Sequence, residues 1–166
     1  MRNLLFLLLA GWSLAVAAQA VPFAKGRAAI TPPPGYIHVL EDDGQTIALV
    51  PRDRLFQIRF TYHAVPARKD HPQLAREFVI ETAKQKDKKV TQVKGSNSIG
   101  FMERAPSVMV DGEENRTLQG MFTLGQGYVT TVLWVPERNV QLPEMREFMK
   151  NGIEPLIAAL QARGKP

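Results

Sequence analysis

The chain has 166 residues, no cysteine and a formal net charge of +5, and 45% of its residues are hydrophobic. This length suits one compact domain, and the lack of cysteine excludes disulfides, thiol catalysis and a lipid-bearing cysteine. The mild positive charge permits weak contact with anionic lipid or an acidic protein. The sequence carries no nucleic-acid recognition motif, so we expect no nucleic-acid partner.

Residues 1–20 have the three-part layout of a secretory signal peptide. A short positive start precedes the apolar run Leu4–Ala18, and Ala18-Gln19-Ala20 supplies the small-x-small pattern of a cleavage site. The run is shorter than the roughly 20 residues that span a bilayer, which disfavours a stable membrane anchor. We expect cleavage after Ala20 and a bacterial location in the periplasm or outside the cell.

The rest of the chain is expected to comprise a lead-in segment at residues 21–30, a single globular domain at 31–163 and a tail at 164–166. The domain begins with Thr31–Tyr36, TPPPGY, which contains the Pro-Pro-x-Tyr pattern of polyproline ligands. Modules that read this pattern are not expected outside a bacterial cytoplasmic membrane. We therefore interpret the prolines as a stiff, extended approach to the first strand and expect Tyr36 to be largely buried.

Residues 36–63 show patterns that are typical of β-strands. Residues 36–40 and 46–50 flank a turn with Asp-Gly, which predicts a hairpin. Residues 55–63 alternate in polarity, which predicts a strand with one buried face. The residues expected on that face are Phe56, Ile58, Phe60 and Tyr62.

Over residues 73–86 the spacing of the apolar residues changes to that of a helix. Asp70 is the expected N-cap, and Pro72 lies where its missing N–H costs nothing. The apolar stripe is expected to contain Leu74, Phe78, Ile80 and Ala83, with Ala75 and Val79 beside it.

The second half predicts further strands and a closing helix. Ala105-Pro106 is expected to separate two strands, and residues 128–135 carry bulky side chains on both faces, which is typical of a central, doubly covered strand. A final helix is expected from 143 to 162, interrupted near Asn151-Gly152 and Pro155. The other strands are expected at residues 90–94, 99–104, 107–110 and 116–124.

This order predicts an α+β fold, in which one twisted antiparallel sheet of about six to eight strands is flanked by two main helices.

The chain resembles the PsbP-like superfamily, which includes the bacterial DcrB-like envelope proteins. The resemblance depends on the Pro34-Gly35-Tyr36 approach, the 56–60 run, the helix near 72–87, the Gly127-Tyr128 turn and the final helix. It implies an α/β/α sandwich that acts as a binding or assembly module rather than an enzyme. DcrB-like proteins are typically lipoproteins, and this chain lacks the lipid-bearing cysteine, so their membrane attachment is not carried over.

Residues that could carry chemistry are few. The spacing of His38, His63 and His71 matches no metal motif, and no nucleophile elbow is present. The acidic clusters 41–43 and 111–114 lie at predicted turns and lack the spacing of a calcium loop. We therefore expect no catalytic residue, no metal and no cofactor.

The best candidate for a partner surface is basic. It consists of Arg68, Lys69, Arg76, Lys84, Lys86, Lys88 and Lys89. A merely solvated helix face explains the same residues and is the favoured interpretation.

From these observations we expect an exported, non-enzymatic envelope protein that binds a protein partner, either as an accessory or assembly factor or as an immunity-type inhibitor of a delivered toxin. Two alternatives stay open. One is a carrier that holds a small apolar ligand or lipid between sheet and helix, and the other is a carboxylate-dependent hydrolase.

Overall fold

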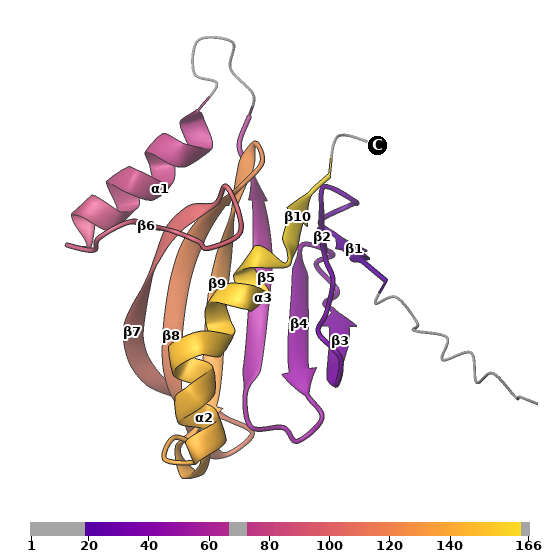
Figure 1. Ribbon diagram of the computed structural model, residues 1–166, viewed down its shortest axis with the longest axis vertical. Coiled ribbons are helices and arrows are strands. Elements are labelled where there is room, and N and C mark those ends of the chain that lie inside the picture. Colours follow the sequence, from indigo (N-terminus) through magenta and orange to yellow (C-terminus); the bar gives the residue numbers. More distant parts are fainter. Residues whose placement is uncertain (1–18, 67–72, 164–166) are drawn as a thin grey trace, which may run out of the picture.

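The computed structural model describes residues 19–66 and 73–163. Its main feature is a seven-stranded antiparallel sheet in the order β3-β4-β5-β9-β8-β7-β6 (Figure 1). The strands are β3 (Tyr36–Leu40), β4 (Thr46–Pro51), β5 (Gln57–Ala64), β6 (Thr91–Gln92), β7 (Ile99–Val110), β8 (Glu113–Leu124) and β9 (Gly127–Pro136). The predicted α+β class, the antiparallel sheet and the two main helices are confirmed.

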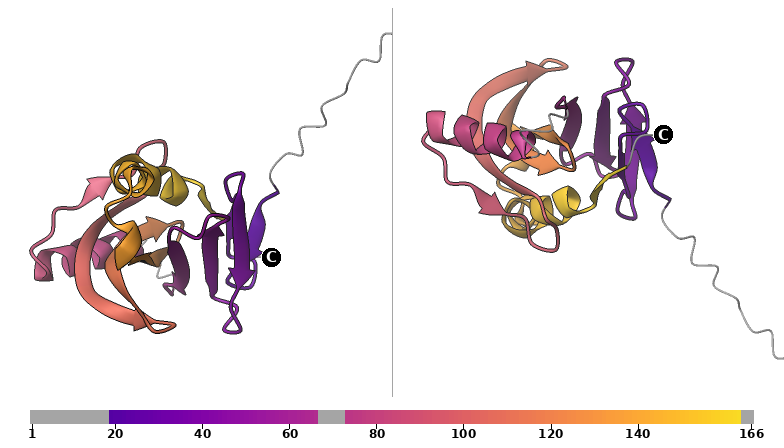
Figure 2. Two further views of the ribbon diagram at one scale, coloured as in Figure 1. Left: turned by 90° about the horizontal axis from the view of Figure 1, so that it is seen from below. Right: turned by 90° about the horizontal axis from the view of Figure 1, so that it is seen from above.

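Helices cover the two faces of this sheet. The C-terminal helix, made of α2 (Pro143–Glu147), the π-helical turn η2 (Phe148–Gly152) and α3 (Ile153–Ala158), lies along one side of the curved strands (Figure 2). It packs on the face that carries Phe60 and Leu133, which we call the core face. Helix α1 (Leu74–Gln85) packs on the other face, the outer face, where the Phe78 ring lies 5.0 Å from that of Tyr128.

The alternation predicted for β5 is confirmed. Ile58 and Phe60 are fully buried on the core face, and the residues between them are only partly covered. Full burial of one such side chain contributes about 1.5–3 kcal/mol. Strand β9 has the same alternation and lies between β5 and β8, so the prediction of a central strand is also confirmed.

Tyr36 is half-buried rather than largely buried. Its ring meets Phe56 edge-on at 6.1 Å, and Phe56 in turn stacks on Phe148 of η2 at 3.9 Å. The start of β3 is therefore anchored to the C-terminal helix through two aromatic rings. Gly35 has a φ of 87°, a conformation that favours glycine at this turn into the sheet.

The buried side of α1 agrees with the predicted stripe at Ala83 but differs from it elsewhere. Ala75, Val79 and Ala83 are buried, whereas Phe78 and Ile80 are 45% and 41% exposed. Three small residues spaced four apart bring the helix backbone close to the sheet, which leaves its larger neighbours at the rim. Asp70 and Pro72 lie outside the described residues, and Gln73 precedes the helix without a side-chain cap.

Residues 21–30 are not a loose lead-in. They form strands β1 (Val21–Phe23) and β2 (Ala28–Ile30), and β2 also pairs with β10 (Leu160–Ala162) to give a three-stranded sheet. Phe23 and Ile30 belong to the hydrophobic core. The prediction failed because two three-residue strands carry no periodicity that a sequence can display.

Two expectations for the second half are corrected. Ala105-Pro106 does not divide a strand, because β7 continues to Val110 through an irregularity between Ala105 and Val108 that absorbs the proline. The final helix ends at Ala158, and the residues after it form β10. The predicted interruption is confirmed at Asn151-Gly152 as the π-helical turn, whereas Pro155 lies within α3.

Within residues 19–66 and 73–163, no helix is both long and apolar enough to cross a membrane.

Candidate functional site

The histidines do not converge. His38 lies on the edge strand β3, whereas His63 lies on β5, and His71 lies outside the described residues. Within the described part of the chain, no group of three or more His, Cys, Asp or Glu side chains could hold a metal ion. His63 instead has a structural setting: its Nε2 lies 2.9 Å from Thr130 Oγ1, and its ring stacks on Tyr128 at 4.7 Å.

Burial lowers the pKa of His63 below its usual value of 6.5. The folded protein therefore binds fewer protons than the unfolded chain once the pH falls below about 6.5. We expect the free energy of unfolding to fall as the pH decreases through 6.5 toward the lowered pKa of His63. Raising the pH above 6.5 should restore it. Urea denaturation at pH 7.5 and 5.5 measures this, and His63→Gln should reduce the difference. An equal pH dependence in the variant would contradict the assignment.

The carboxylates of the two acidic turns make local structural contacts. Asp43 Oδ1 accepts hydrogen bonds from the backbone N–H groups of Gln45 and Thr46, and its Oδ2 accepts one from Thr46 Oγ1. The hydrogen bond from the Thr46 hydroxyl is the main reason why the pKa of Asp43 lies below its usual value. In the other cluster, Glu113 pairs with Arg138 at 3.1 Å.

The basic residues of the predicted partner surface are dispersed. Lys86 and Lys88 both reach Glu103 on β7, and the bond from Lys86 is the main cause of the lowered pKa of that carboxyl. Lys84 lies 4.0 Å from Glu81, in an exposed pair. Arg76 and Lys89 are exposed, and Arg68 and Lys69 lie outside the described residues. Whether this surface binds a partner stays a prediction.

A groove on the core face is a stronger candidate for a binding site than the basic surface of α1. It lies between the distal half of the β7–β8 hairpin and α2, and it has a volume of about 760 Å³. This volume is within the usual range of ligand pockets, which is about 300–1,000 Å³. Its floor and inner wall are apolar, and the residues there are Leu118, Val135, Val140, Met145 and Met149.

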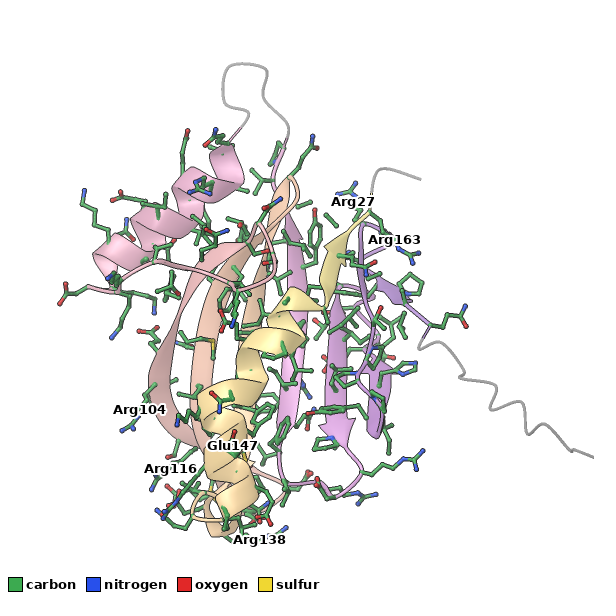
Figure 3. The ribbon with its side chains drawn as sticks, in the orientation of Figure 1. Arg27, Arg104, Arg116, Arg138, Glu147 and Arg163 are labelled. Carbon is green, nitrogen blue, oxygen red and sulfur yellow. The ribbon has the colours of Figure 1, made fainter. Side chains whose placement is uncertain are left out.

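The sheet register explains how the groove is lined. Arg104 of β7 is the register partner of Leu118 in β8, and Arg116 is the partner of Val135 in β9. All four therefore lie on the same face of the sheet, with the two arginines next to the apolar floor. Figure 3 shows both arginines on the lower part of the hairpin, beside α2.

Cations surround this floor. Arg104 and Arg116 come from the hairpin, and Arg146 and Lys150 come from the C-terminal helix; the lining contains no carboxylate. Arg116 is neutralised by two hydrogen bonds to Glu137, of 2.9 and 2.7 Å, and Arg146 bonds to the amide of Gln141. Among the described residues, Arg104 and Lys150 have no carboxylate within ion-pair distance.

Two exposed apolar side chains adjoin the segments that line the groove. Met109, the register partner of Glu114 and therefore on the core face, is 67% exposed, and Leu142, which precedes α2, is 36% exposed. Met149 in the groove wall is 39% exposed. An apolar surface with a basic border is suited to a ligand that is apolar and negatively charged.

The groove was not found in the sequence. Its four cations are spread over 47 positions along the chain, from Arg104 to Lys150, and no two of them form a motif. Only the register of β7 with β8 and the path of α2 bring them together. The one available signal was the run of Met and basic residues in the final helix, which a solvated helix face explains equally well.

No protein-family model matches the chain. No curated protein matches it either.

Several solved structures are similar to this chain, and two of them are described here. One is a crystal structure of a protein from Bacteroides thetaiotaomicron VPI-5482, with a TM-score of 0.63 and 14% identity over 90% of this chain and 50% of that one. This chain therefore spans about half the length of that protein. The other is the solution structure of cyanobacterial PsbP (CyanoP) from Synechocystis sp. PCC 6803, with a TM-score of 0.44 and 11% identity over 91% and 96% of the two chains.

At these identities, similarity concerns the fold and not the function. The residues of the groove therefore have to be interpreted by their own chemistry. What the comparison does show is that this chain shares its α+β fold with the Bacteroides protein.

Proposed function

We propose that this chain is an exported, non-enzymatic envelope protein that binds a protein partner, and that the partner places an acidic segment with apolar side chains in the groove between β7–β8 and α2. An accessory factor and an immunity-type inhibitor would both use such a site. The observation that carries the proposal is the pair of cations without a carboxylate partner among the described residues, Arg104 and Lys150, beside an apolar floor.

The charges and the shape support a peptide. An acidic side chain of the partner would neutralise Arg104 or Lys150, and charge-assisted hydrogen bonds of this kind contribute about 1.5–3 kcal/mol. The apolar side chains of the same segment would bury Met149 and the neighbouring Leu118. The groove is open to solvent, so an extended chain can enter it.

A carrier of an apolar anion is the second candidate. The floor made by Leu118, Val135 and Met145 would hold an acyl chain, and the cations would bind its head group. The hydrolase alternative has less support, since Asp43 and Glu113 are engaged in turn and ion-pair contacts.

Fluorescence anisotropy tests the proposal with a labelled peptide of alternating leucine and aspartate. Binding should weaken about ten- to a hundredfold in the double variant Arg104→Glu/Lys150→Glu, because two attractive contacts become repulsive. The matched control is Lys84→Glu/Lys89→Glu, which changes the charge equally on and just after α1. It should retain the affinity of the unmodified protein.

The other outcomes are equally informative. Loss of binding only in the α1 variant would contradict binding in the groove and would assign the peptide to the basic helix. A peptide with lysine in place of aspartate should not bind, and equal binding of the two peptides would contradict the role of charge. Binding of oleate but of neither peptide would replace the proposal with the carrier.

A further inference from the structure

Strand β3 forms an unprotected edge of the seven-stranded sheet. Among the described strands it pairs only with β4, and Figure 1 shows it at the outer side of the sheet. Its Ile37, Val39 and Leu40 are 49%, 52% and 49% exposed. The strand contains no proline, lysine or acidic residue, which are the usual means of preventing edge-to-edge pairing. The opposite edge, β6, has only two residues.

The hydrogen bonds around β3 show which backbone groups face outward. Arg52 N–H donates to Gly35 C=O at 3.0 Å, and Glu41 N–H donates to Thr46 C=O at 2.9 Å. In an antiparallel ladder alternate residues bond to the same neighbour, so the odd-numbered positions of β3 bond to β4. The even-numbered positions, Tyr36, His38 and Leu40, therefore direct their backbone groups to the free edge.

We propose that this edge binds a second copy of the chain, by antiparallel pairing of β3 with β3 about a two-fold axis at His38. In this register the outward N–H and C=O groups of His38 bond to those of the other His38. Each Leu40 N–H then meets the C=O of Tyr36 in the second copy. The N–H of Tyr36 is already bonded to Pro33 C=O at 3.3 Å and needs no partner.

The side chains are compatible with this register. Ile37 lies opposite Val39 on the outer face, and Tyr36 lies opposite Leu40 on the core face, which gives apolar cross-strand pairs on both sides. A closed two-fold pair consumes both exposed edges, so it ends the association at two copies. The two main sheets would become one continuous sheet of fourteen strands, twice the seven of one chain.

The charges are complementary in the same arrangement. The turn after β3 is acidic, with Asp42 exposed, and the turn beside the start of β3 carries Arg52 and Arg54 on either side of Asp53, all three exposed, so that two positive charges outweigh one negative charge. These turns lie at opposite ends of the strand, since Arg52 bonds to Gly35 and Glu41 to Thr46. Antiparallel pairing places the acidic turn of each copy next to the basic turn of the other. Parallel pairing would bring like charges together.

Cysteine cross-linking tests the axis directly, because the chain has no cysteine of its own. Two residues that form a hydrogen-bonded antiparallel pair have Cα atoms about 5.5 Å apart, within the range of a disulfide. His38→Cys, in the protein expressed from its full-length sequence, should give a covalent dimer on mild oxidation. Leu40→Cys lies off the axis, and Gln92→Cys lies on the other edge, so neither should cross-link efficiently.

A charge exchange tests the pairing without oxidation. Sedimentation velocity should show a concentration-dependent dimer whose dissociation constant rises about tenfold in Asp42→Arg and in Arg52→Glu. The double variant Asp42→Arg/Arg52→Glu restores complementarity and should return the constant toward that of the unmodified protein. Thermal melts of all four proteins control for loss of fold.

Three results would overturn the proposal. They are a monomer at every concentration, equal cross-linking of the His38→Cys and Leu40→Cys variants, and a double variant as weak as either single one. Because the groove lies between β7–β8 and α2, on the far side of β5 and β9 from this edge, peptide binding there is a separate measurement. Each proposal can fail while the other stands.

Discussion

Phe60→Ala should lower the free energy of unfolding by about 3–5 kcal/mol, the largest effect expected for any single change considered for this protein. Phe60 is fully buried in β5, between β4 and β9, and belongs to the core under the C-terminal helix. Removing its ring loses the transfer free energy of the buried atoms and leaves a cavity that surrounding strands cannot close. Since small domains are stable by only about 5–15 kcal/mol, the variant should be marginally folded.

Guanidinium denaturation measures this loss, and Phe78→Ala is its matched control. The same ring is removed there, but Phe78 is 45% exposed at the rim of α1. We expect a cost of about 1 kcal/mol or less, since roughly half of its surface stays in water in the folded state. Equal costs at the two positions would contradict the assignment of the core to the C-terminal helix side.

Gly100→Ala should destabilise the protein by about 1–3 kcal/mol or more through overpacking. Gly100 in β7 is the register partner of Phe122 in β8. A Cβ added to Gly100 would overlap the backbone carbonyl of Met121 and the ring of Phe122, which lies across the glycine. The carbonyl belongs to the neighbouring strand, so it cannot move away without disturbing the ladder.

The control is a glycine with open space around it. Gly112 in the hairpin turn has a φ of 79°, and an added Cβ would meet no atom within 4 Å. Asparagine tolerates this conformation, so Gly112→Asn should change the free energy of unfolding by about 0.5 kcal/mol or less. Denaturation midpoints of the two variants compare crowding with backbone strain. A mild effect at Gly100 would show that β7 and β8 can separate locally.

The sequence predicted the parts of the fold that have long, regular patterns. The alternation in 56–62 and 128–135 identified β5 and β9, because a half-buried strand requires it. It did not predict the contact side of α1. Hydrophobicity favoured Phe78 for the core, but the close approach of the helix to the sheet selected Ala75, Val79 and Ala83.

The candidate sites show a similar division. A sequence displays runs of charge, so the basic helix was visible and the groove was not. Arg104 and Lys150 line the same groove only because of the register of β7 with β8 and the position of the C-terminal helix. The edge of β3 was visible as a hairpin strand. That it lies at the end of the sheet depends on β5 pairing with β9 instead of returning to β3.

The small sheet β1-β2-β10 links the two ends of the described chain. Its central strand, β2, pairs on one side with β1 and on the other with β10. Ala28, Ala29 and Ile30 are completely buried, so this sheet cannot be complete before Leu160 is available. During synthesis from the N-terminus, β2 therefore has no β10 to pair with until residues 160–162 have been made. A strand near the start of the described chain can thus complete its hydrogen bonding only after a strand near its end has been synthesised.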